Sequence, residues 1–244
     1  MDKIISCVDL RNFAYVNDRI CKMPVKGIVI EFFGLNGSAM YEEDTEEGRF
    51  YAENGILFVI PYTNPWSWMN RQAVLYTDEI IDVIIEKFGL DGNIPIVSTG
   101  GSMGGQSALV YSVYAKRTPV CCTANCPVCD LPFHFTERPD LPRTLYSAFF
   151  YEDGSVNDVL QTASPIHLAP KMPPIEYHIF HCGEDRAVNI SKHSEKFVDE
   201  MKKHGQNITF DVVPGRGHCE LTEETRGLYR EYILKSIFNK TQHK

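Results

Sequence analysis

The chain has 244 residues and a formal net charge of −8, with 43% hydrophobic and 23% charged residues. These values are typical of a globular protein, and an acidic chain without a basic run is not expected to bind nucleic acid or a membrane surface. No apolar stretch approaches the ~20 residues that span a bilayer, and the N-terminus lacks the pattern of a secretory signal. We therefore expect a cytoplasmic protein whose eight cysteines are free thiols.

Short apolar runs alternate with helical patterns along the chain. Buried strands are expected at residues 27–34, 55–62, 93–99, 118–124, 175–182 and 208–213, and one or two antiparallel strands are expected in the first 26 residues. Helical patterns cover about 69–88, 103–116, 191–204 and 221–238, and Gly89 is expected to end the first of them. This alternation predicts a mostly parallel sheet with helices on both faces.

One stretch, residues 131–170, departs from this pattern. It is rich in proline and aromatic residues, and it is too long for an ordinary connection. We expect it to be a small insertion that folds over the end of the sheet, within a single domain that spans residues 1–244.

The stretch VSTGGSMGGQSA, residues 97–108, places four glycines around Ser102 at a strand-to-helix junction. Gly100 to Gly104 fits the G-x-S-x-G pattern, in which a sharp turn exposes a nucleophilic serine. The N–H of Met103 would then lie at a helix N-terminus and face developing negative charge. A phosphate-binding glycine loop is the less favoured interpretation, because no lysine stands in the Walker position.

A nucleophilic serine needs a base, and the base needs an orienting acid. His218 follows a strand and a glycine-rich turn, which places it at the same sheet edge as Ser102. Glu184 and Asp185 follow the strand that lies between them in the sequence. With His218 as the base, activity is expected to rise through an apparent pKa of roughly 6–7.

GGSMGG after a strand, HCGEDRAV and VVPGRGH together resemble the prolyl-oligopeptidase/esterase branch of the α/β-hydrolases, over roughly residues 27–240. The resemblance implies an α/β-hydrolase fold with an eight-stranded sheet and a small lid, and a triad of Ser102, Asp185 and His218. Many relatives carry His-Gly-Gly where this chain has Phe33-Gly34-Leu35. The second oxyanion donor is a backbone N–H, for which we expect Leu35, with Gly34 as the alternative.

Other residues allow more than one interpretation. Trp66, Trp68, Phe133 and Phe149 are expected to line the substrate pocket, although ordinary packing is an equal alternative for the two tryptophans. Cys126 and Cys129 have the spacing of metal ligands, but no second such pair exists, so we expect buried thiols and no metal.

Together these features predict a serine hydrolase that cleaves carboxylic esters of small or aromatic acyl groups through an acyl-enzyme. It would need no cofactor, and its partner would be a small-molecule ester. The alternative is a prolyl-oligopeptidase-like aminopeptidase or dipeptidyl peptidase, which is less favoured because no region of β-propeller size precedes the strands. A catalytically silent binding protein on the same fold is the further alternative. The sequence does not indicate an oligomeric state.

Overall fold

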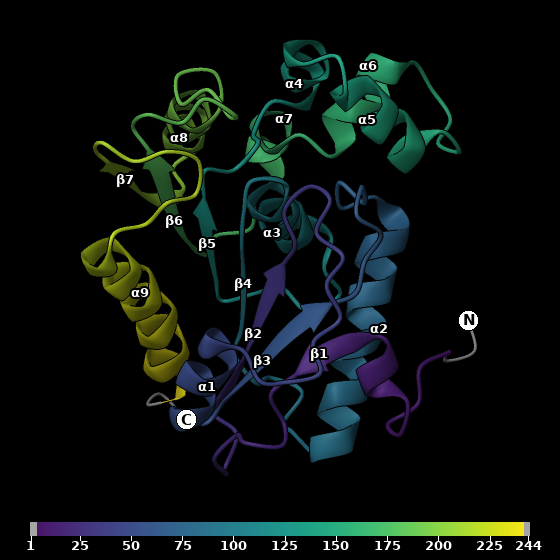
Figure 1. Ribbon diagram of the computed structural model, residues 1–244, viewed down its shortest axis with the longest axis vertical. Coiled ribbons are helices and arrows are strands. Elements are labelled where there is room, and N and C mark those ends of the chain that lie inside the picture. The colour runs from purple at the N-terminus through teal and green to yellow at the C-terminus, as the bar shows by residue number, and fades with distance from the viewer. Residues whose placement is uncertain (1–3, 242–244) are drawn as a thin grey trace.

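A seven-stranded sheet forms the centre of the structure, a computed structural model that describes residues 4–241 (Figure 1). The strand order is β1-β3-β2-β4-β5-β6-β7. Their bounds are β1 (Ala14–Val16), β2 (Gly27–Phe32), β3 (Ile56–Pro61), β4 (Ile96–Gly101), β5 (Cys121–Asn125), β6 (Glu176–Cys182) and β7 (Asn207–Val213). Only β1 is antiparallel to its neighbour. Each of the six predicted buried strands is present.

The prediction of eight strands differs from the structure by one. Within residues 4–241 the N-terminal part contributes β1 alone, preceded by a short 3-10 helix, η1 (Leu10–Asn12). Residues 18–26 form turns and irregular backbone instead of a second strand. Pro24 lies among them and has no N–H to donate to a neighbouring strand.

Five helices pack on the sheet: α1 (Glu46–Glu53), α2 (Arg71–Phe88), α3 (Met103–Tyr114), α8 (Ser194–Lys203) and α9 (Glu223–Thr241). The side chain of Asn70 accepts a hydrogen bond from the N–H of Ala73 and begins α2, and Gly89 ends it in the left-handed conformation, as predicted. No helix within residues 4–241 has both the length and the apolar character needed to cross a membrane.

The two faces of the sheet bury alternate residues of the strands. Ile28 and Ile30 of β2 pack in a core with α2, α3 and α8, whereas Val29 packs on the opposite face with residues of α1 and α9. Covered faces on both sides explain why the strands are apolar almost without interruption.

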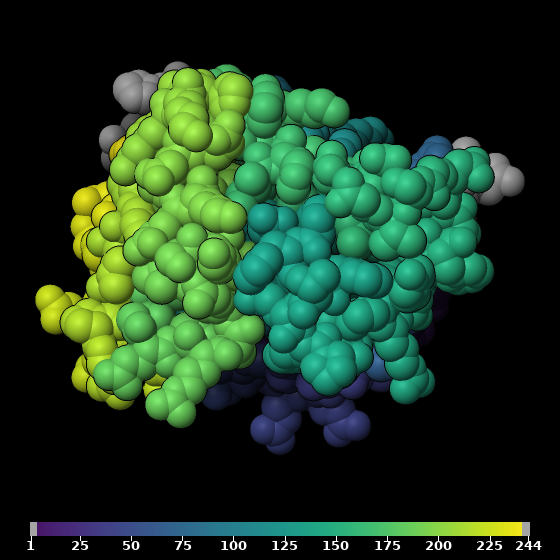
Figure 2. All heavy atoms as spheres, turned by 90° about the horizontal axis from the view of Figure 1, so that it is seen from above, coloured from purple at the N-terminus to yellow at the C-terminus, as the bar shows by residue number. Residues whose placement is uncertain are grey.

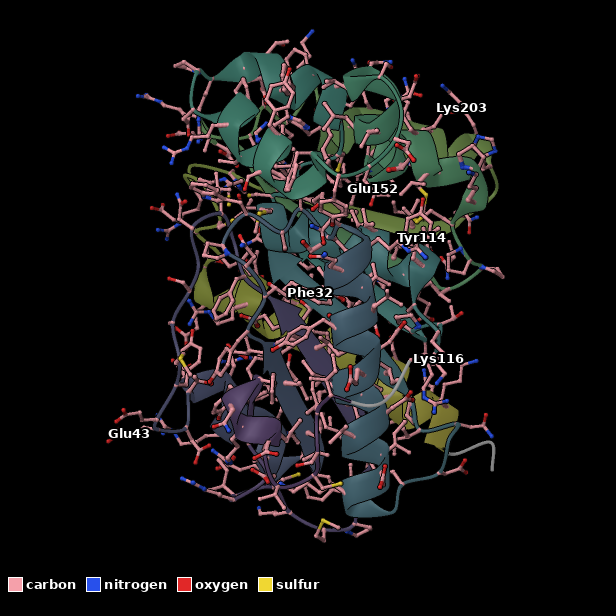
Figure 3. All side chains as sticks on the ribbon, turned by 90° about the vertical axis from the view of Figure 1, so that its right-hand side faces the viewer. Phe32, Glu43, Tyr114, Lys116, Glu152 and Lys203 are labelled. Atoms are coloured by element: carbon pink, nitrogen blue, oxygen red, sulfur yellow. The ribbon has the colours of Figure 1, made fainter. Side chains whose placement is uncertain are left out.

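Residues 131–170, which we call the lid segment, lie beyond the carboxyl ends of the strands (Figure 1, top). They form α4 (Leu131–Glu137), α5 (Leu141–Phe149), α6 (Val156–Thr162), α7 (Pro165–Leu168) and the first part of a 3-10 helix, η2 (Ala169–Lys171). From above, the lid segment and the region of α8 lie side by side over this end of the molecule (Figure 2). Figure 3 shows the lid helices above Phe32, the last residue of β2.

The lid segment is joined firmly to the sheet layer through α3. The side-chain amide of Gln106 donates hydrogen bonds to the carbonyls of Trp68, at 3.1 Å, and Ala163, at 2.8 Å. The indole N–H of Trp68 donates to the Thr144 hydroxyl at 3.0 Å. Met103, the first residue of α3, packs into the core of the lid segment.

The turn from β4 into α3 crosses the end of β2 at very short range. Phe32 stands opposite Gly100 in the sheet. A Cβ atom on Gly104 would lie 2.1 Å from the carbonyl oxygen of Phe32, and one on Gly100 would lie 2.6 Å from the carbonyl group of Gly104. Both glycines are therefore required by backbone contacts that no side-chain movement relieves.

We expect Gly104→Ala to lower the free energy of unfolding in urea by about 3 kcal/mol or more, because the backbone of β2 or α3 has to move. Gly227→Ala in α9 is the matched control, since nothing lies within 4 Å of its Cβ position. That change should raise stability by up to ~1 kcal/mol, the usual gain from replacing a helical glycine. Equal changes in the free energy of unfolding for Gly104→Ala and Gly227→Ala would contradict the close contact between Gly104 and Phe32.

Candidate active site

Ser102 occupies the turn between β4 and α3 with φ 59° and ψ −124°, a conformation that non-glycine residues adopt only when their surroundings impose it. Three backbone hydrogen bonds hold it there. The N–H of Ser102 donates to the carbonyl of Asn125 at 2.9 Å, and its own carbonyl accepts from Gln106 and Val128. The strained turn places Ser102 on the wall of a cleft of about 480 Å³.

Asp185 and His218 form a close pair at the same cleft. The Nδ1–H of His218 donates to Oδ2 of Asp185 at 2.6 Å, and the Asp185 side chain is fully buried. The other oxygen, Oδ1, accepts the N–H groups of Ala187 and Val188 at 2.8 and 3.0 Å. The carboxylate is thus fixed by the loop after β6, and His218 by the carboxylate.

Glu184, the other carboxylate that the sequence offered, takes no part in this pair. Its backbone N–H donates to the carbonyl of Arg216, and the residue lines a shallower hollow outside the cleft. Among the described residues Asp185 is the carboxylate hydrogen-bonded to His218.

His181 supports Asp185 from within β6. Its Nε2 lies 3.0 Å from the carbonyl of Val188, which can only accept, so Nε2 carries the proton. The same nitrogen is 3.4 Å from Oδ2 of Asp185, and Nδ1 accepts from the Ser194 hydroxyl at 2.7 Å. Sequence reasoning did not single out His181, and its position four residues before Asp185 was the available signal.

The contact between Asp185 and His218 shifts the pKa of both side chains. Burial raises the pKa of Asp185, but hydrogen bonds from His181 and His218 outweigh it and hold that pKa well below its usual range. Burial lowers the pKa of His218, but the hydrogen bond to Asp185 and the adjoining Cys126 outweigh it and raise the pKa to about 9. This pKa is higher than the roughly 6–7 expected from the sequence, and the larger of the two causes is the hydrogen bond to the buried carboxylate.

The third contact of a triad is not formed in this structure. Among the described residues no hydrogen bond joins Ser102 to His218, and Nε2 of His218 lies 3.7 Å from the Cys219 sulfur. Both Ser102 and His218 nevertheless line the same cleft.

The loop after β2 passes directly beside Ser102. A Cβ atom on Gly34 would lie 3.9 Å from Cβ of Ser102, and Leu35 lines the cleft. The N–H of Leu35 enters no hydrogen bond among the described residues. The N–H of Met103, in the first turn of α3, has no partner within the helix. Neither of the two expected oxyanion donors is engaged in a hydrogen bond among the described residues.

The four residues that were expected to line the substrate pocket lie at different places in the structure. Trp68 lines the cleft with Ser102. Trp66 lines a different hollow, where its indole N–H donates to the Asn36 side chain at 2.6 Å. Phe133 packs against the His193 ring, and Phe149 belongs to the core of the lid segment. Those three do not contribute to the wall around Ser102.

Sequence reasoning missed three ionisable residues that line the cleft: Glu31, His134 and Arg138. Burial raises the pKa of Glu31 to about 7. His134 is buried in α4, and its Nδ1 is hydrogen-bonded to Glu137, which also accepts from Nε2 of His193 at 2.9 Å. The spacing of His134 and Glu137, three residues apart on one helix, was the signal for this contact.

The sheet order, the serine turn between β4 and α3 and the His–Asp pair on the loops after β6 and β7 define the structure as an α/β-hydrolase. The sequence profile of the Prolyl oligopeptidase family matches residues 80–241. This match covers more than half of the chain, and the chain belongs to that family.

Solved structures with this fold include both peptidases and esterases. Dipeptidyl peptidase 4 of Porphyromonas gingivalis has a TM-score of 0.66 and 16% identity, with 93% of this chain and 33% of that chain covered. An S-formylglutathione hydrolase from Agrobacterium tumefaciens has a TM-score of 0.66 and 16% identity, with coverages of 94% and 87%. A thermophilic esterase from the Planctomycetes species Thermogutta terrifontis has a TM-score of 0.63 and 17% identity, with coverages of 91% and 86%.

The chain thus spans about a third of the dipeptidyl peptidase. None of the curated protein sequences matches it.

We expect His218 to titrate well above 6.5, near a pKa of about 9, in an NMR titration of the imidazole signals. Asp185→Asn should move this pKa down toward 6.5, because the neutral amide no longer favours the imidazolium. His178, whose pKa burial lowers, is the internal reference, and His218→Gln assigns the signal. A pKa of His218 at or below that of His178 would contradict the described pair.

Proposed function

We propose that this protein is a serine hydrolase that cleaves carboxylic esters of small or aromatic acyl groups through an acyl-enzyme. The observation that carries the proposal is the hydrogen bond between Asp185 and His218 at the cleft that Ser102 lines. A buried carboxylate bound to Nδ1 leaves Nε2 as the nitrogen that exchanges a proton with the nucleophile.

In the proposed reaction His218 takes the proton of Ser102 as the oxygen attacks the acyl carbon. The N–H groups of Met103 and Leu35 bind the oxyanion that forms. His218 then gives its proton to the leaving alcohol. In the second half of the reaction water attacks the acyl group, His218 accepts a proton from that water, and His218 returns the proton to Ser102 as the acid leaves. Because Nε2 lies against Cys219, its hydrogen bond to Ser102 has to form as substrate enters the cleft.

The form of the cleft supports a compact ester. Its volume of about 480 Å³ is that of a small-molecule site, and Phe32, Phe33, Leu35 and Trp68 supply apolar walls. His134 and Arg138 add polarity on the side of the lid segment. The reaction as proposed needs no cofactor.

A second candidate is an aminopeptidase or dipeptidyl peptidase. Two observations favour it: membership of the prolyl oligopeptidase family and the presence of Glu31 in the cleft. A substrate ammonium usually needs more than one acidic acceptor, and Glu31 is the sole carboxylate among the described residues that line this cleft. Burial also raises the pKa of Glu31 to about 7, which weakens it as an anion. We therefore place the ester first.

A fluorophosphonate probe should label Ser102, and Ser102→Ala should abolish labelling. Asp185→Asn should slow labelling and ester turnover by about 10⁴, because the imidazole loses the carboxylate that fixes its tautomer. Glu184→Gln is the matched control and should change either rate less than threefold. Labelling that persists in Ser102→Ala, or a larger loss in Glu184→Gln, would refute the assignment.

Short-chain and aromatic acyl esters should be hydrolysed with a higher kcat/KM than aminoacyl or dipeptidyl amides of the same leaving group. A matched series of chromogenic substrates measures this directly, and Glu31→Gln tests the alternative. If amides are the better substrates and Glu31→Gln raises their KM, the peptidase takes the place of the esterase.

A further inference from the structure

Three metal-ligating side chains meet beside the cleft. The Cys126 and Cys219 sulfurs and a ring nitrogen of His218 all lie within 4.8 Å of one another. Cys126 is fully buried after the end of β5, whereas His218 and Cys219 belong to the loop after β7. Residues up to 93 positions apart in the sequence are thus brought together at the carboxyl ends of β5 and β7, which lie on either side of β6.

The spacing fits a tetrahedral zinc ion. Zn–S bonds of about 2.3 Å and Zn–N bonds of about 2.0–2.1 Å place neighbouring ligand atoms roughly 3.6–3.8 Å apart in a tetrahedron. Nε2 of His218 and the Cys219 sulfur are 3.7 Å apart. Nδ1 of the same ring is already bound to Asp185, and a carboxylate in that position orients an imidazole whose other nitrogen binds zinc.

The neighbouring backbone holds the inner sulfur in place. The Cys126 sulfur accepts the N–H groups of Cys182, at 3.3 Å, and Cys219, at 3.4 Å. His218 and Cys219 line the cleft, so an ion reaches this cluster from solvent and finds room there for a water as fourth ligand.

Hydrogen bonds engage the side chains of two other groups of ligand type, fully in one and partly in the other. In the first, Glu137 binds His134 and His193. In the second, the Ser236 hydroxyl donates to Glu176 and Nδ1 of His178 is bound to Thr209, whereas Nε2 of His178 has no hydrogen-bond partner among the described residues. The cluster of Cys126, His218 and Cys219 combines two thiols with an imidazole nitrogen that no hydrogen bond to oxygen occupies among the described residues.

We propose that Cys126, Cys219 and His218 form a binding site for Zn²⁺, and that the bound ion inhibits the hydrolase by occupying Nε2 of His218. Binding replaces the protons of the two thiols with bonds to the ion, and these two protons leave to solvent; where the imidazole is protonated, Nε2 of His218 loses its proton to solvent as well. The inhibition rests on the proposed function, because it removes the nitrogen that accepts the Ser102 proton. The binding itself does not.

Binding is tested without reference to activity. Reduced protein, freed of metal with a chelator, is titrated with Co²⁺, whose thiolate complexes show charge-transfer absorption and tetrahedral visible bands. We expect one Co²⁺ per chain with this absorption, and displacement by Zn²⁺. Cys219→Ser, Cys126→Ser and His218→Ala should each weaken binding at least tenfold. Cys129→Ser, a buried thiol outside the cluster, is the matched control and should bind as the native chain does.

Inhibition is then measured as the ratio of fluorophosphonate labelling with and without Zn²⁺ in each variant. The ratio should fall at least tenfold for the native chain and for Cys129→Ser, recover with a chelator, and stay near one for Cys219→Ser. Cys219 is partly exposed, so Cys219→Ser is expected to fold. This variant therefore tests the inhibition even if Cys126→Ser does not fold. Absence of thiolate absorption, or equal inhibition in Cys219→Ser, overturns the proposal. A native chain that binds Co²⁺ through thiolates but never labels contradicts the proposed function and leaves the metal site standing.

Discussion

The contact between the carbonyl oxygen of Phe32 and the backbone at Gly104 is the constraint on which the candidate site depends. It fixes where α3 begins relative to the end of β2, and only a residue without a side chain allows it. Because β2 also carries the loop with Gly34 and Leu35, the same contact sets the distance between that loop and Ser102. Ser102, the proposed nucleophile, and its expected oxyanion donors are thus positioned by main-chain atoms, which vary little in position as side chains reorient.

The arrangement of Asp185 and His218 depends on a different principle, the free-energy cost of burying a charge. A buried carboxylate is unfavourable unless it is fully hydrogen-bonded. Asp185 meets that condition with two backbone N–H groups and two imidazoles. The arrangement keeps Asp185 ionised and transfers its effect to His218, whose affinity for a proton rises. A base made stronger in this way removes a serine proton more readily, but it is free to act only at higher pH.

The sequence predicted what depends on local pattern, and it missed what depends on distant packing. The buried strands, the helix end at Gly89 and the glycine turn around Ser102 follow from periodicity and from residues with special backbone freedom. The separation of Trp66 from Trp68 follows from positive φ angles at Trp68 and Met69, neither of which is a glycine, so no pattern marks the change of direction. The contact between His193 and Glu137 joins residues 56 positions apart in the chain, and no local pattern marks it.

The hydrogen bonds of Gln106 bear on how reactants exchange with solvent. This one side chain, on the helix that follows Ser102, holds both the loop at Trp68 and the end of α6 at Ala163. Lifting the lid segment would break the bond from Gln106 to Ala163 and the bond from the Trp68 indole to Thr144, and each loss inside the protein is costly. These bonds resist displacement of the lid segment, so they favour a cleft whose wall keeps its shape as molecules enter and leave.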